Sequence, residues 1–183
     1  MTPRKYAALL RGINVGGNKK VPMAELRQVL EGLGHEDVRT YLQSGNAVFA
    51  GAERDTTKLA RALEAAIEAH FGFKVPCLVV DGDHLRAVVD ACPFPAAELE
   101  GRQLHATFCS VQPGEERFAA IDAPAYLPEE FRVGDRVVYL HTPDGLGRSK
   151  LAEALARPAV VKGLDVTTRN WNTVVKLVEL TRD

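Results

Sequence analysis

The sequence predicts an α+β protein built of two similar α/β halves, each with a mostly antiparallel sheet and helices packed on its faces. Short apolar runs alternate with longer segments whose apolar residues recur at helical spacing. Polar turns at 43–46 and 134–135 separate neighbouring apolar runs, so they predict hairpins. Residues near the two ends of the chain also resemble each other at an offset of about 130 positions, which indicates an internal repeat.

The first half, residues 1–95, is expected to alternate strands with helices. Apolar runs predict strands at Tyr6–Leu10, Val38–Leu42, Ala47–Ala50 and Val75–Val80. Residues suited to a first turn or an N-cap predict helix starts at Pro22, at Thr56 or Thr57, and at Asp81 or Asp83. The helices are expected to end at Gly34, at Gly72 and before Pro93 and Pro95.

The second half, residues 96–183, begins with a polar connection at 96–103, which is the expected boundary between the halves. A strand is predicted at Leu104–Val111 and a hairpin at Phe131–Val133 and Arg136–His141. Between them we expect a short helix at 115–121 and a loop marked by Pro124 and Pro128. The glycine loop Thr142–Ser149 then leads to a helix at Lys150–Ala156, an extended or irregular segment at 160–168, and a last helix from about Asn170.

The internal repeat rests on matches that keep the same order in both segments. The matched pairs are Leu10 with Leu140, Gly17–Lys20 with Gly147–Lys150, Ala24-Glu25 with Ala152-Glu153, Gly32-Leu33 with Gly163-Leu164, and Asp37–Thr40 with Asp165–Thr168. Each segment reads as strand, glycine loop, lysine, helix, Gly-Leu and Asp-Val-x-Thr. This order predicts a duplication in which the two glycine loops occupy equivalent positions.

Charge is unevenly distributed along the chain, although the net charge is only −1. Residues 1–50 hold seven Lys/Arg against four Asp/Glu, and residues 131–183 hold nine against six. Residues 81–130 hold three against ten. If the two basic ends meet in space, they form a positive surface that attracts an anion; the alternative is solvated charge spread over the protein.

The cysteines and the hydropathy pattern indicate a cytoplasmic protein. The three cysteines, Cys77, Cys92 and Cys109, are widely spaced among apolar neighbours and form no C-x-x-C pattern. We therefore expect buried, reduced thiols and a reducing compartment. No signal-peptide pattern is expected because Arg4, Lys5 and Arg11 interrupt the first apolar residues. No stretch approaches the roughly 18 apolar residues of a membrane span.

The two glycine loops are the best candidates for a ligand site. Backbone N–H groups in such a loop can approach a ligand closely, and the first turn of the following helix favours negative charge. Neither loop matches the Walker A or the dinucleotide-binding pattern, and a loop of this kind can also serve only to turn the chain. The candidate ligand-binding residues of the two loops are Arg11, Asn14, Gly16, Gly17, Lys19, Lys20, Gly147, Arg148, Ser149 and Lys150.

Two further segments are rich in hydrogen-bonding side chains that carry no negative charge. They add Gln43, Ser44, Asn46, Arg169, Asn170 and Asn172 to the candidate site. Arg169 could form a bidentate contact with a phosphate or carboxylate. Trp171 could stack on a ring, but its position on the apolar face of the last helix favours packing in the core, and Thr168 and Asn170 could also be helix caps.

No catalytic or metal-binding pattern is present. The five histidines at 35, 70, 84, 105 and 141 form no H-E-x-x-H or H-x-H motif, and G-x-S-x-G is absent. Asp81 and Asp83 could pair around a metal, but helix capping explains them better. We therefore expect no metal site, the sequence identifies no cofactor, and it leaves open whether the protein is an enzyme.

Four motifs in order resemble an uncharacterised bacterial family, domain of unknown function 1697. They are Leu-Leu-Arg-Gly-Ile-Asn-Val-Gly-Gly at 9–17, Thr-Tyr-Leu-Gln-Ser-Gly-Asn at 40–46, Gly-Arg-Ser-Lys-Leu at 147–151 and Thr-Arg-Asn-Trp-Asn-Thr at 168–173. The resemblance implies a two-part α+β structure with repeated, ferredoxin-like halves. It implies no activity, substrate or catalytic residue. The motifs do coincide with the polar and basic loops chosen above.

Three functions follow as hypotheses. The first is binding of a phosphorylated or other anionic small molecule, such as a nucleotide, at the paired loops. The second is binding of single-stranded nucleic acid through the same basic residues, with affinity that falls steeply as salt is added. The third is a transferase or hydrolase that acts on a phosphorylated compound. No membrane partner is expected, and the sequence does not specify the oligomeric state.

Overall fold

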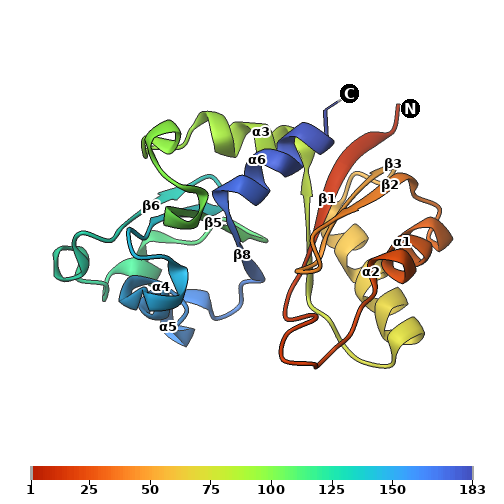
Figure 1. Cartoon of the computed structure of the whole chain (residues 1–183), viewed down its shortest axis with the longest axis horizontal. Coiled ribbons are helices and arrows are strands. Elements are labelled where there is room, and N and C mark those ends of the chain that lie inside the picture. The colour runs from red at the N-terminus through yellow and green to blue at the C-terminus, as the bar shows by residue number, and fades with distance from the viewer. Residues whose placement is uncertain (1, 183) are drawn as a thin grey trace. The chain divides into compact units, whose positions relative to one another are not determined.

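The computed structural model describes residues 2–182, which form two compact units (Figure 1). Unit 1 runs through Leu85 and takes in the chain again from Leu177. Unit 2 spans Arg86–Lys176. The divisions therefore fall inside two helices, α3 (Gly82–Asp90) and α6 (Trp171–Leu180), and not in the polar connection at 96–103.

Unit 1 is a four-stranded antiparallel sheet with two helices. Its elements are β1 (Arg4–Leu10), α1 (Met23–Gly32), β2 (Glu36–Tyr41), β3 (Asn46–Gly51), α2 (Thr56–Phe71) and β4 (Cys77–Asp81). The strand order is β2-β3-β1-β4, so the apolar strand β1 lies in the interior of the sheet. The elements of unit 1 therefore follow one another in the order β-α-β-β-α-β.

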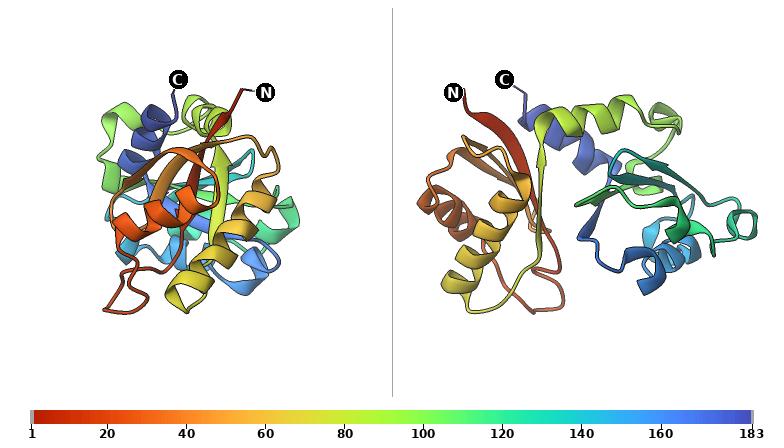
Figure 2. Two further views of the ribbon diagram at one scale, coloured as in Figure 1. Left: turned by 90° about the vertical axis from the view of Figure 1, so that its right-hand side faces the viewer. Right: turned by 180° about the vertical axis from the view of Figure 1, so that it is seen from behind.

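The core of unit 1 lies between the sheet and the helices α1 and α2, which lie side by side on one face of the sheet (Figure 2). Because successive strand residues point to opposite faces, β1 presents Tyr6, Ala8 and Leu10 to this core. Helix α1 contributes Leu26 and Leu30, which are fully buried one helical turn apart. The inward-facing side chains of β1 and the apolar face of α1 thus pack in one core.

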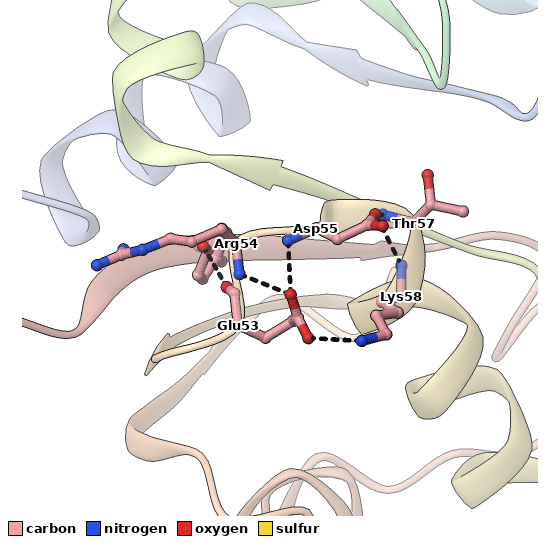
Figure 3. A network of polar contacts seen from close by, with 6 residues as sticks. Glu53, Arg54, Asp55, Thr57 and Lys58 are labelled. Carbon is pink, nitrogen blue, oxygen red and sulfur yellow. Dashed lines mark hydrogen bonds and ion pairs between the residues drawn. The ribbon is translucent and has the colours of Figure 1, made fainter. Parts of the chain in front are cut away.

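Helix α2 begins at a dense polar network (Figure 3). Asp55 is the N-cap, where its carboxylate accepts hydrogen bonds from the N–H groups of Thr57 (2.9 Å) and Lys58 (3.2 Å). Glu53 accepts from the N–H of Asp55 at 2.9 Å and pairs with Lys58 at 3.3 Å, and these contacts lower the pKa of its carboxyl. The expectation that Thr56 or Thr57 caps this helix is wrong, since the carboxylate of Asp55, one residue earlier, accepts from both of these N–H groups.

Unit 2 contains a second four-stranded antiparallel sheet. Its strands are β5 (Leu104–Cys109), β6 (Glu130–Gly134), β7 (Val137–His141) and β8 (Val166–Asn170), in the order β6-β7-β5-β8. Two short helices, α4 (Lys150–Leu155) and α5 (Pro158–Val161), stand between β7 and β8. The segment between β5 and β6 has only 3₁₀ turns, η3 (Glu115–Phe118) and η4 (Ala123–Tyr126). Two more, η1 (Ala96–Glu98) and η2 (Gly101–Gln103), precede β5, and η5 (Leu146–Arg148) precedes α4.

One core of unit 2 joins β5 and β7 to α4. It contains Cys109, Val138, Leu140, Leu151 and Leu155, all of which are buried. On β7 the neighbouring residue Tyr139 instead packs its ring near Trp171 and donates its hydroxyl to the Val88 carbonyl at 2.6 Å. The sheet of unit 2 therefore buries side chains on both faces.

The predicted fold class is confirmed, because two similar α+β halves with antiparallel sheets are present. The segment 160–168, expected to be extended or irregular, instead holds the end of α5 and the start of the edge strand β8. In the described chain, no helix combines the length and the apolar character that a membrane crossing requires.

The segments matched at an offset of about 130 positions are β1-α1-β2 in unit 1 and β7-α4-α5-β8 in unit 2. In each unit the first strand of the segment is an inner strand of the sheet, and the second is the edge strand two places away. When the strands are compared in chain order, β1 corresponds to β5 and β3 to β7 instead. The internal repeat and the equivalence of the two glycine loops therefore stay predictions.

Candidate functional site

The first glycine loop, residues 11–20, connects β1 to α1 and is coloured red in Figure 1. Its first residues are fixed by two neighbouring connections. The N–H of Leu10 donates to the Gly45 carbonyl at 2.8 Å, in the turn between β2 and β3. The N–H of Arg11 donates to the Pro76 carbonyl at 3.0 Å, just before β4. Loop 11–20 thus starts where three connections of unit 1 meet.

Asn14 joins the two ends of loop 11–20 to the β2–β3 turn. Its Nδ2 donates to the carbonyls of Val21 (3.1 Å) and Gln43 (2.7 Å), and its Oδ1 accepts from the N–H of Val21 at 2.9 Å. Asn14 has a φ of 55°, a conformation that asparagine tolerates better than most residues. An asparagine here therefore satisfies both the backbone conformation and three hydrogen bonds.

The tip of loop 11–20 is exposed but is not free of structure. The N–H of Asn18 donates to the Val15 carbonyl at 3.0 Å, and the N–H of Asn14 donates to the Lys19 carbonyl at 3.1 Å. The ammonium group of Lys19 donates to the Lys74 carbonyl at 2.7 Å. Lys19 therefore keeps its charge at the loop while its side chain links the tip to the connection before β4. Gly16 and Gly17 lie at the exposed tip.

Loop 11–20 concentrates positive charge, because it holds Arg11, Lys19 and Lys20 and no acidic residue. Arg11 and Lys20 are both exposed. Within residues 2–182, neither of these two side chains has an ion pair or a hydrogen bond to the protein. The charge of this surface is thus available to an external anion.

The predicted site residues of the β2–β3 turn differ in their exposure to solvent. Gln43 and Ser44 are exposed next to the Asn14 bridge. Asn46 is fully buried, and its amide donates to the Tyr41 carbonyl at 2.9 Å and to Ser44 Oγ at 3.3 Å. Asn46 therefore holds the turn closed, whereas Gln43 and Ser44 lie at the surface beside loop 11–20.

The second glycine loop, residues 142–149, leads into α4 in unit 2 and meets a carboxylate. Ser149 is the N-cap of α4 and accepts from the N–H of Ala152 at 2.9 Å. The Glu129 carboxylate accepts from Ser149 Oγ at 3.0 Å and from the N–H of Leu151 at 2.9 Å. An acidic side chain of the protein itself therefore occupies the start of this helix.

The remaining residues of this loop carry charge at the surface. Gly147 and Arg148 are exposed, and Lys150 pairs with Glu153 at 3.6 Å. Asp144 lies in the same loop. The local positive charge is therefore smaller than at loop 11–20.

The polar segment 168–173 serves mainly to connect β8 to α6. Arg169 donates to Thr167 Oγ1 at 2.8 Å and to the Thr168 carbonyl at 3.0 Å, and burial lowers its pKa to about 10. Asn170 Oδ1 accepts from the N–H of Thr173 at 3.0 Å, so it caps α6. The side chain of Asn172 lies so close to Gly101 that a Cβ at Gly101 would stand 2.3 Å from it.

Unit 2 also holds a buried histidine, His105, near the start of loop 142–149. The residue is 5% exposed, and its Nδ1 lies 3.4 Å from Thr142 Oγ1. Burial lowers its pKa to about 4, so the ring is neutral at pH 7. His105 pairs across the sheet with Asn170.

Burial determines the electrostatics of the three thiols. Burial raises the pKa of Cys77 to about 12 and of Cys109 to about 11, and it also raises the pKa of Cys92. A thiol with a raised pKa supplies little thiolate at pH 7 and is a poor nucleophile. Among residues 2–182, no group of three or more His, Cys, Asp or Glu side chains is arranged to hold a metal ion.

Two contact residues were not among the predicted site residues. Glu129 and the Lys74 carbonyl each lie far along the chain from the loop that they contact. A carboxylate that reaches a helix start across 20 residues leaves no local signal in the sequence. The Lys19 contact likewise depends on the folded arrangement of α2 and β4.

The family described as protein of unknown function (DUF1697) matches residues 3–139. The chain belongs to the DUF1697 family. The matched region contains loop 11–20 and the β2–β3 turn, whereas loop 142–149 and the segment 168–173 lie beyond it. The two neighbouring connections of unit 1, loop 11–20 and the β2–β3 turn, therefore both belong to the part of this DUF1697 chain that the family matches.

A solved structure shares this fold. The conserved bacterial protein SP0830 from Streptococcus pneumoniae is similar with a TM-score of 0.72 and 24% identity, covering 98% of this chain and 99% of that one. No curated protein matches this DUF1697 chain. The structural similarity supports the two-unit α+β fold.

Proposed function

We propose that this DUF1697 protein binds a phosphorylated or otherwise anionic small molecule at loop 11–20 of unit 1. The observation that carries the proposal is the pair of exposed cations Arg11 and Lys20, which have no partner within residues 2–182. Asn14 holds the backbone of this loop in place through three hydrogen bonds. Binding therefore requires little reordering of the loop, and that lowers its entropic cost.

Lys19, Gln43 and Ser44 complete the proposed site. Lys19 adds a third positive charge whose side chain is already held by the Lys74 carbonyl. Gln43 and Ser44 are exposed beside the Asn14 bridge and offer neutral hydrogen-bond donors. Charged and neutral donors of this kind are the usual partners of phosphate oxygens.

Loop 142–149 is not assigned the same role. The Glu129 carboxylate accepts hydrogen bonds from Ser149 and Leu151 at the start of α4. A second anion here would meet this negative charge and lose donors that are already engaged. Arg148 is exposed here, but the other cation at this place, Lys150, pairs with Glu153.

Nucleic-acid binding is the weaker alternative. It would rely on aromatic side chains that stack on unpaired bases, as well as on cations. Trp171 is 7% exposed and packs near Tyr139, so its ring is not offered to a base. The cations of loop 11–20 would then bind phosphates without an aromatic platform.

The test is calorimetric titration of the purified protein with sodium tripolyphosphate at constant ionic strength. The double variant Arg11→Ala/Lys20→Ala should bind at least about tenfold more weakly, because each charge-assisted hydrogen bond is worth roughly 1.5–3 kcal/mol. The matched control is Arg4→Ala, which removes an exposed cation at the opposite end of β1. The proposal fails if the parent protein does not bind or if the control loses as much affinity as the double variant.

A salt series with a single-stranded DNA 30-mer separates the two functions. Nucleic-acid binding predicts affinity for the 30-mer that exceeds the affinity for tripolyphosphate and falls steeply between low and physiological salt. The proposed small-molecule site predicts no gain from the longer strand. Tight, salt-dependent binding of the 30-mer that is lost in the double variant would reassign loop 11–20 to nucleic acid.

A further inference from the structure

Loop 11–20 and the β2–β3 turn expose apolar side chains as well as cations. Val15 is 66% exposed and Leu42 is 51% exposed. The only other large apolar side chain of unit 1 that is comparably exposed in residues 2–182 is Leu33, at 37%, at the end of α1. Of the two most exposed apolar side chains of the unit, Val15 thus lies in loop 11–20 with Arg11 and Lys20, and Leu42 lies in the neighbouring β2–β3 turn.

The bridge made by Asn14 brings these residues together. Asn14 is adjacent to Val15 in the chain, and its amide bonds to the carbonyl of Gln43, the neighbour of Leu42. The same side chain bonds to Val21, the neighbour of Lys20. Val15, Leu42 and Lys20 are therefore each adjacent in sequence to a residue that takes part in this bridge.

Leu42 is also held in an unfavourable backbone conformation. Its φ is 61°, in the left-handed region that a leucine rarely adopts, and its carbonyl accepts from the N–H of Gly45 at 3.2 Å. Asparagine or glycine would satisfy this turn at lower cost and would not expose an apolar group to water. Strain of this kind is concentrated at functional sites, where the surrounding structure maintains it.

We infer that the ligand of loop 11–20 is a nucleotide, whose phosphates contact Arg11 and Lys20 and whose base lies against the apolar side chains of Leu42 and Val15. This inference rests on the proposed function and adds the class of ligand. Small-molecule sites combine apolar contact with a few placed polar groups, and bases are commonly held between apolar side chains. Gln43 and Ser44 follow Leu42 in the exposed turn and supply hydrogen bonds to a sugar or a base edge.

A small ring fits this surface better than a lipid bilayer does. Interfacial membrane binding needs a long apolar face bordered by several cations. Unit 1 offers only two exposed apolar side chains in these two short connections, which is too few for such a face. The charge of the loop, three cations and no acidic residue, matches the phosphates of one nucleotide.

The experiment compares ATP with sodium tripolyphosphate, which carries the phosphates without the nucleoside. Titrations are carried out on the parent protein and on Leu42→Asn at the same ionic strength. Asparagine tolerates the left-handed conformation, so the variant keeps the turn and removes only the apolar contact. The matched control is Leu33→Asn, which changes an exposed leucine of the same unit outside the two connections.

ATP is expected to bind about tenfold more tightly than tripolyphosphate, the gain from burying one apolar side chain against the base. Leu42→Asn should remove this preference and leave tripolyphosphate binding unchanged, whereas Leu33→Asn should change neither. Equal binding of ATP and tripolyphosphate by the parent overturns the inference but leaves the proposed function standing. An ATP preference that survives in Leu42→Asn also overturns it. Absence of binding by both probes refutes the proposed function together with the inference.

Discussion

Replacing Gly45 by alanine should destabilise unit 1 and loosen the base of loop 11–20. Gly45 has a φ of 99°, which an L-residue rarely adopts. A Cβ at this position would lie 2.8 Å from both Ile13 Cδ1 and Leu10 Cβ, and real Cβ atoms do not approach other atoms so closely. Ile13 is 1% exposed and belongs to the core of unit 1, so it has little room to withdraw.

Two costs add in this variant. A non-glycine residue held at such a φ costs roughly 1–3 kcal/mol. Forcing an extra methyl group into a packed core costs roughly 1–3 kcal/mol more. The sum is about 4 kcal/mol, a large part of the roughly 5–15 kcal/mol that stabilises a typical domain.

Gly34→Ala is the matched control for the backbone cost. Gly34 lies in the same unit and has a φ of 89°, but a Cβ there would have no neighbour within 4 Å. Urea unfolding followed by circular dichroism should therefore show a loss at Gly45 that exceeds the loss at Gly34 by about 2 kcal/mol. Equal losses in the two variants would refute the close packing of Ile13 and Leu10 around the β2–β3 turn.

Two further predictions concern unit 2. The pKa of His105 lies at about 4 when folded and near 6.5 when unfolded, so the unfolded state binds more protons between these values and stability falls as pH decreases through this window. The shift lowers the free energy of unfolding by at most about 3 kcal/mol between pH 7 and pH 4. In parallel urea titrations the His105→Gln variant should therefore lose less stability over this range than the parent. A variant with the same pH profile as the parent would contradict the burial of His105. Glu129→Ala should lower the stability of unit 2 by about 2 kcal/mol because two donors at the start of α4 lose their acceptor, and Glu129→Gln should recover part of this loss. Thermal unfolding of both variants measures the effect, and a Glu129→Ala protein as stable as the parent would show that the carboxylate is dispensable there.

The elements of unit 1 could be predicted because their signals are local. The apolar run of β1 and the helical spacing of Leu26 and Leu30 each depend on neighbouring residues and on one buried face. The N-cap of α2 was misassigned because aspartate and threonine are both good caps and the two stand next to each other. Here only the folded backbone decides which side chain reaches the free N–H groups.

The strand β8 was harder to predict because it is short and polar. Its residues Thr167, Thr168 and Arg169 lack the apolar alternation of a strand buried on one face. It forms at the edge of the sheet, where the hydroxyls of Thr107 and Thr168 meet at 2.7 Å across the strands. That cross-strand bond depends on long-range pairing, which no window of the sequence contains.

The internal match at an offset of about 130 positions corresponds to a likeness of local structure. Both matched segments run from a strand through a glycine loop and a helix to a parallel strand two positions away in the sheet. Any such segment needs a flexible loop, a helix start and a second strand, so similar residues recur for the same physical reason. Which strand of one half corresponds to which strand of the other is set by pairing across the sheet.

The two glycine loops differ in their surroundings because each contacts residues from a distant part of the chain. Both loops contain glycines and at least one basic residue and precede a helix, so their sequences alone predict two equal anion sites. In unit 2 the Glu129 carboxylate accepts hydrogen bonds from donors at the start of α4, and Lys150 pairs with Glu153. In unit 1 the corresponding neighbours are carbonyl groups: Lys19 donates to Lys74, and Asn14 donates to Gln43. Carbonyl partners fix the loop without cancelling its charge, so loop 11–20 keeps the positive potential that an anionic ligand requires.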